Sequence, residues 1–111
     1  MSLQWAGMSV AVRAADVNAV LAETGKPGLR DYVRDLGAQA LEGLRQAVGG
    51  IPMRSEPIVS WNGPTDDPIQ GPIYVLQIAA QVEADDLPAG STMRAAWDRH
   101  GVLTTEPGVI L

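Results

Sequence analysis

The sequence contains no cysteine and no phenylalanine, and it has a single lysine and a single histidine. Without cysteine the chain can form no disulfide, no thiolate zinc site and no thiol nucleophile. No stretch approaches the roughly 18 apolar residues that a membrane-spanning helix needs. Residues 1–7 lack the basic and apolar regions of a signal peptide. We therefore expect a protein that stays in the cytoplasm or joins a particle assembled there.

Clustered positive charge is also missing. The formal net charge is −5, and the arginines are spread along the whole chain. Nucleic-acid-binding domains normally carry a basic face, because contacts to phosphates supply much of their affinity. The sequence therefore predicts no sequence-specific nucleic-acid partner, and nothing in it indicates a membrane partner.

The length and the apolar content indicate one folded domain. A chain of 111 residues suits a single domain, and a hydrophobic share of 46 % is too high for a disordered protein. Residues 8–111 are expected to form an α+β domain, and residues 1–7 are set apart as a candidate N-terminal arm that carries Trp5.

The strongest periodic pattern lies in the first half of the chain and runs from Pro27 to Gly49. Apolar residues recur there at steps of three and four, with charged residues on the opposite side, which predicts a long amphipathic helix packed on a sheet. Alternation over residues 8–13 predicts a short strand before it. Between the two, Asp16 is expected to cap a short helix that stops at Gly25.

The second half of the chain reads mainly as strands. Residues 57–61 are expected to form a strand that ends at the turn sequence Asn62-Gly63-Pro64. Residues 65–72 form a loop or the tip of a long hairpin, and clear alternation over residues 73–83 predicts the next strand. A short helix capped by Ser91 or Thr92 and one or two short strands within residues 102–111 complete the order β-α-α-β-β-α-β, a small antiparallel or mixed sheet covered by one long helix.

No pattern in the sequence indicates catalysis. His100 has no identifiable serine or aspartate partner, and it suits the last turn of a helix. The segment Gly25-Lys26-Pro27-Gly28 lacks the serine or threonine of a phosphate-binding loop. The acidic pairs near residues 66 and 85 lack the ligand spacing of a calcium loop. We expect that the protein is not an enzyme and has no catalytic residues, no cofactor and no metal. A small α+β domain that binds a ligand, or binds a cation weakly, remains an alternative to the two functions considered below.

Two segments carry a resemblance to a known family. The long helix is followed by Pro52-Met53-Arg54-Ser55-Glu56-Pro57-Ile58, and the later strand ends in Ala79-Ala80-Gln81-Val82-Glu83. With the order of elements, these segments resemble the small head–tail joining proteins (neck or tail-completion proteins) of long-tailed bacteriophages. The corresponding pattern in that family is Pro-x-(Arg/Lys)-Thr-Gly-x-(Leu/Ile). In this sequence Ser55 stands for the threonine, and Glu56 replaces the glycine.

The resemblance implies a structural role in a virus particle. Copies of the chain would form a ring that joins the head connector to the tail and surrounds a channel for DNA, with adjacent connector or tail proteins as partners. The alternative is a small cytosolic dimeric module that binds other proteins. Tryptophan is common at interface hot spots, and the predicted hairpin could reach a neighbour. The interface candidates are Trp5, Trp61, Asn62, Gly63, Asp66, Asp67, Ile69 and Trp97.

Overall fold

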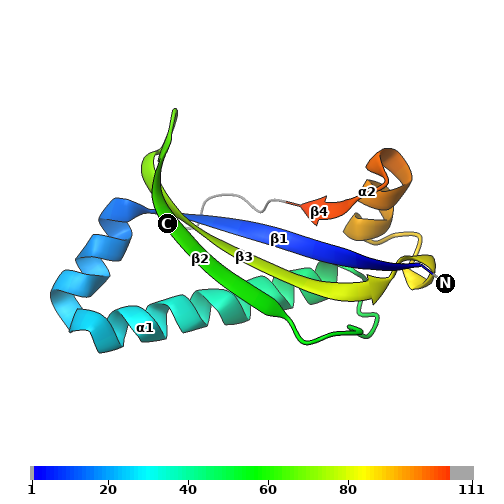
Figure 1. Ribbon diagram of the computed structural model, residues 1–111, viewed down its shortest axis with the longest axis horizontal. Helices are drawn as coiled ribbons and strands as arrows, with labels where there is room; N and C mark the ends of the chain where they lie inside the picture. Colours follow the sequence, from blue (N-terminus) through cyan, green and yellow to red (C-terminus); the bar gives the residue numbers. More distant parts are fainter. Residues whose placement is uncertain (1, 106–111) are drawn as a thin grey trace.

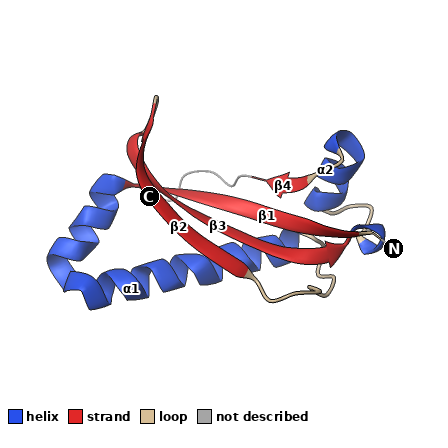
Figure 2. Ribbon diagram, viewed as in Figure 1, coloured by secondary structure: helices blue, strands red, loops and turns tan. Residues whose placement is uncertain are grey.

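The computed structural model describes residues 2–105, which form a four-stranded sheet with a long helix on one face (Figure 1). The strands lie in the order β2-β3-β1-β4; β1 and β2 each pair antiparallel with β3, and β4 pairs parallel with β1. Figure 2 shows the three long strands side by side and the helices around them. The predicted α+β class is confirmed.

Strand β1 (Leu3–Arg13) is longer than the sequence pattern indicated. It pairs with β3 (Gly71–Glu83) along its whole length, from Leu3 opposite Glu83 to Arg13 opposite Ile73. Residues 3–7, which the sequence set apart as a candidate arm, are thus the first half of this strand. The long partner strand β3 explains the difference, because its last residues satisfy the backbone hydrogen bonds of residues 3–7.

Helix α1 (Ala14–Ala47) joins the two helices that the sequence predicted, with a kink at Gly25. Gly25 has a φ of 70° and a ψ of −171°, so the helical path breaks there, and Pro27 lies in the first turn beyond the break. The helix begins directly after β1, and Arg13 takes the cap position without a side-chain hydrogen bond. Asp16, expected as the cap, lies instead in the first turn. The predicted end of the long helix at Gly49 is confirmed, since Val48 is the C-terminal cap.

Strands β2 (Ile58–Asp67) and β3 form a long hairpin. The sequence Asn62-Gly63-Pro64, expected to end the first strand, instead forms a bulge at which the register shifts between Asn62 and Thr65. Gly63 has a φ of 135°, and a Cβ there would lie 2.9 Å from the carbonyl oxygen of Ile73. A glycine at such a position is typical of a bulge as well as of a turn, because both need unusual backbone angles. Of the two predicted forms of residues 65–72, the hairpin tip is correct.

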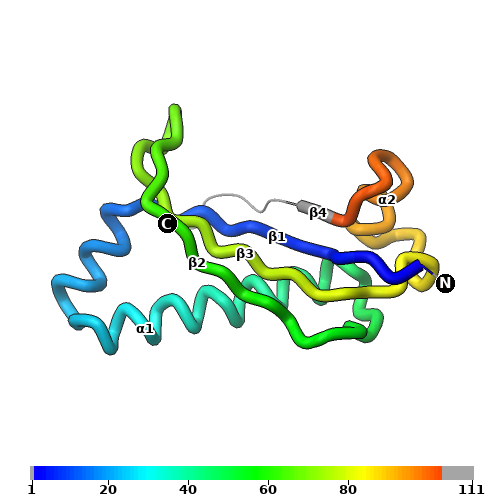
Figure 3. Tube along the Cα trace, viewed as in Figure 1, coloured from blue at the N-terminus to red at the C-terminus, as the bar shows by residue number. Residues whose placement is uncertain are grey.

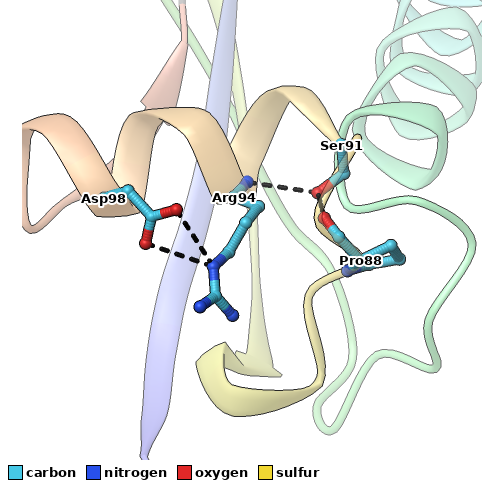
Figure 4. A network of polar contacts seen from close by, with 4 residues as sticks. All are labelled: Pro88, Ser91, Arg94 and Asp98. Atoms are coloured by element: carbon cyan, nitrogen blue, oxygen red, sulfur yellow. Dashed lines mark hydrogen bonds and ion pairs between the residues drawn. The ribbon is translucent and has the colours of Figure 1, made fainter.

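The last elements are a 3-10 turn, η1 (Ala84–Asp86), helix α2 (Thr92–His100) and strand β4 (Leu103–Thr105). Figure 4 shows the start of α2, where the Ser91 hydroxyl accepts a hydrogen bond from the Arg94 amide and donates one to the Pro88 carbonyl. Gly101, with a φ of 70°, ends the helix as predicted. The expectation of further strand structure up to residue 111 lies partly outside the described residues.

The hydrophobic core lies between α1 and one face of the sheet. Alternate residues of β1 and β3 are buried on this face, as the pattern of the later strand predicted, and Met93 of α2 and Leu103 of β4 complete the core. The fully buried large side chains are Leu44, Leu76, Ile78, Met93, Leu103, Val12, Val48 and Val82. Because the buried positions alternate, the remaining positions of these strands point to the opposite face.

Candidate functional site

The described part of the chain contains neither a metal-binding cluster of side chains nor a membrane-spanning helix. Within residues 2–105, no three histidine, cysteine, aspartate or glutamate side chains lie close enough together to hold a metal ion. No helix in that range is long and apolar enough to cross a membrane. The carboxylates near residue 85 have structural contacts: Asp86 pairs with Arg54 at 3.6 Å, and Glu83 accepts a hydrogen bond from the Ser2 amide.

The face of the sheet that points away from α1 carries small and apolar residues at one end. In the cross-strand row there, Gly7 of β1 is opposite Ala79 of β3, which is opposite Ile58 of β2. Ile58 ends this row and is 58 % exposed, and Trp5, two residues before Gly7 on β1, is 48 % exposed. We call these four residues the flat patch. A patch of this kind is typical of a surface that contacts another protein.

The three tryptophans occupy different environments. Trp5 is the most exposed of them and belongs to the flat patch. Trp61 lies on the helix-facing side of β2 and stacks on Tyr74, with the ring centroids 5.1 Å apart and the planes 9° from parallel. Trp97 of α2 is half-buried against the core. Trp61 and Trp97 therefore contribute to the packing of their own subunit, and only Trp5 offers a large free surface.

The hairpin tip holds three of the remaining candidates, Asp66, Asp67 and Ile69. Asp67 Oδ1 accepts hydrogen bonds from the amides of Ile69 at 2.9 Å and of Gln70 at 2.7 Å. These bonds stabilise the carboxylate and hold the pKa of Asp67 below its usual value. The side chain of Ile69 is 91 % exposed, the highest value among the large apolar residues that the structure describes. Asn62 and Gly63 lie lower on the same hairpin, at the exposed bulge.

A pocket of about 390 Å³ lies at the opposite end of β2. The segment between α1 and β2 provides most of its wall, and Arg45 of α1 adds a cation at the rim. The lining residues are Arg45, Gly50, Ile51, Pro52, Met53, Ser55, Glu56 and Pro57. Our reasoning from the sequence did not find this pocket, although the Pro-x-Arg-Ser segment that forms part of it carried the family resemblance.

Two hydrogen bonds fix the pocket segment on the edge of β3. The Arg54 amide donates to the Gln81 carbonyl at 2.7 Å, and the Ser55 hydroxyl accepts from the Gln81 amide at 2.9 Å. Both backbone groups of Gln81 are thereby satisfied on the side where β2 no longer pairs with β3. Ser55 thus holds the pocket segment with its hydroxyl, a role that threonine could fill equally well.

No protein-family model, curated protein or solved structure matches this chain.

Proposed function

We propose that this protein is a structural subunit of a tailed-phage particle, in which several copies form a ring that joins the head connector to the tail. The observation that carries the proposal is the exposed apolar surface at separate places on one small domain. Leu3, Trp5 and Ile58 are about half exposed near one end of the sheet, and Ile69 is 91 % exposed at the hairpin tip. Contact with another protein would remove this surface from water, which gains roughly 25 cal/mol of favourable free energy for each Å² of apolar surface that is buried.

The distribution of these residues favours a ring over an isolated dimer. In a two-fold dimer the same patch meets itself, whereas a ring uses two different patches on each subunit. Here the flat patch lies at the Ile58 end of β2, and the hairpin tip lies beyond Asp67 at the other end of the same strand. The net charge of −5 also fits a channel through which DNA passes without binding, because like charges repel.

Mass measurement on the full chain tests the assembly part of the proposal. We expect sedimentation velocity and light scattering to show a species several times heavier than the 11.7 kDa subunit, with rings visible by negative-stain electron microscopy. Trp5→Ser should weaken the assembly, whereas Ala38→Ser, on the exposed side of α1, should leave it unchanged. A monomer at every concentration would contradict the proposal, and a discrete dimer would favour the small interaction module instead.

The genes beside this one test the phage part of the proposal. Portal, protease and capsid genes upstream and a tail-tube gene downstream are the neighbours that a head–tail joining protein requires. A ring-forming protein encoded among unrelated genes would retain the assembly part and contradict the phage part.

A further inference from the structure

The hairpin tip carries an exposed apolar side chain, and a pocket on the same chain has a partly apolar wall. We propose that the tip of one copy, with Ile69 foremost, docks into the 390 Å³ pocket of a second copy. This inference rests on the proposed function and names the contact that would build the ring.

The pocket is preformed and mainly apolar. Ile51, Pro52, Met53 and Pro57 supply apolar surface. The hydrogen bond from the Arg54 amide to the Gln81 carbonyl and the one from the Gln81 amide to the Ser55 hydroxyl hold the segment in place without a partner. A preformed pocket loses little conformational entropy when it is filled, so burial of an apolar side chain there retains most of its favourable free energy.

Two hydrogen bonds to Asp67 hold the turn at the tip, and the exposed residue Ile69 is apolar. Turn residues are usually Gly, Pro, Asn, Asp or Ser, whereas Ile69 projects a branched apolar side chain from the turn that Asp67 stabilises. An isoleucine that is 91 % exposed gains nothing within its own subunit. Its full transfer from water is worth about 1.5–3 kcal/mol, and a neighbouring subunit can supply this burial.

The two features cannot meet within one subunit. Pro57 in the pocket wall directly precedes β2, and Asp67 at the tip is the last residue of the same strand. Ten extended residues span roughly 33 Å at 3.3 Å per residue. Figures 1 and 3 show the tip and the loop after α1 at opposite ends of the hairpin. Contact therefore requires two copies, and a head-to-tail contact between two different patches builds a ring where its rotation closes and an open filament where it does not.

The charges of the tip and of the Arg45 side of the pocket are complementary. The tip carries Asp66 and Asp67 and no cation, whereas Arg45 lines the pocket and Arg54 lies in the same segment. The present ion pairs of these arginines are long and exposed, at 3.9 Å from Arg45 to Glu42 and 3.6 Å from Arg54 to Asp86. Exposed pairs of this kind contribute little to stability, so the arginines can turn to the tip carboxylates at small cost.

Glu56 gives the pocket a negative charge as well, and this charge determines the orientation of the docked tip. Carboxylates placed beside Glu56 would be repelled, so the two aspartates should lie on the Arg45 side of the pocket. Glu56→Gln is therefore expected to strengthen the docking, and Arg45→Gln to weaken it.

Disulfide trapping tests the contact directly, because the chain has no cysteine of its own. One preparation carries Ile69→Cys and a second, distinguished by an affinity tag, carries Met53→Cys. When they are mixed and mildly oxidised, we expect a cross-linked heterodimer, since a disulfide needs Cα atoms within about 7 Å. Its formation should be on the order of a hundredfold faster than for Ile69→Cys mixed with Ala38→Cys, because a docked pair reaches an effective concentration in the millimolar range.

Sedimentation of Ile69→Asp separates this inference from the proposed function. The substitution lies at a fully exposed turn and leaves the fold intact, which circular dichroism can verify, and it should shift the assembly to monomer. Cross-linking no faster than the Ala38 control in a protein that still assembles would overturn the docking contact and leave the ring standing. Cross-links between two Ile69→Cys subunits alone would also overturn it, and a wild-type protein that is monomeric and forms no cross-link would overturn both proposals.

Discussion

Two adjacent glycines at the end of α1 allow the packing of the Pro88 segment against this end of the helix to be measured. Gly49 and Gly50 both have positive φ values, of 74° and 80°. A Cβ on Gly49 would lie 2.6 Å from Pro88 Cγ and 2.8 Å from Pro88 Cδ, whereas a Cβ on Gly50 would have no atom within 4 Å. The variants Gly49→Ala and Gly50→Ala therefore share the backbone penalty and differ only in the steric clash.

The magnitudes follow from these two terms. An alanine in the left-handed region costs about 1–2 kcal/mol, and the lower entropy of the unfolded chain offsets about 0.4–1 kcal/mol of that cost. Gly50→Ala should thus lower the free energy of unfolding by about 0–1.6 kcal/mol. Gly49→Ala should lose a further 1–3 kcal/mol or so, because the Pro88 ring and the segment that leads to α2 must move.

Urea denaturation followed by circular dichroism measures both variants, at one protein concentration so that any assembly contributes equally. The midpoint should fall while the slope stays unchanged, which indicates a change of stability and not of the unfolding reaction. Equal losses in the two variants would refute the reasoning, because the close approach of Pro88 to Gly49 would then have no energetic consequence.

Three further results are expected. Leu44→Ala, in the centre of the core, should lower the free energy of unfolding by about 2–5 kcal/mol in urea denaturation. Leu21→Ala on the same helix should lower it far less, because the Leu21 side chain is 39 % exposed. Similar losses in the two variants would contradict the packing of α1. Ser91→Ala should cost about 1 kcal/mol, measured in the same way, because α2 loses the side-chain cap on its first turn. Because the folded-state pKa of Asp67 is lowered, its contribution to stability is present above the ordinary value of 3.8 and is lost as the pH falls below it. The NMR shift of the Ile69 amide should therefore titrate with a midpoint below 3.8, and a midpoint at or above 3.8 would contradict the observed turn.

Local patterns predicted the elements well where one face of an element is buried. The apolar stripe after Pro27 and the alternation in β3 both follow from the contact between α1 and the sheet, and the structure buries the corresponding residues. The start of β1 was not predictable in this way. Its residues 3–7 become a strand through pairing with β3, a contact between positions about 80 residues apart that leaves no local periodic signal.

The exposed apolar residues and the pocket were predicted only in part, for a related reason. Ile69 and Trp5 are apolar residues in places where the sequence pattern expected exposure, and the structure finds both exposed. The pocket arises from the way the segment around Met53 lies across the end of the sheet, and a single sequence does not reveal such a three-dimensional arrangement. The hydrogen bonds of Ser55 are likewise visible only once Gln81 is known to be its neighbour.

The bulge at Gly63 links the fold to the proposed assembly. A flat continuation of β2 and β3 would place the hairpin tip in the plane of the sheet, as an extension of its edge. A bulge bends its strand and increases the local twist, and the end of the hairpin beyond Gly63 curves away from the line of the strands (Figure 1). Ile69 is thereby presented on a projecting arm, free to enter a pocket on another subunit. The same glycine that made the sequence look like the end of a strand thus determines where the strand's far end points.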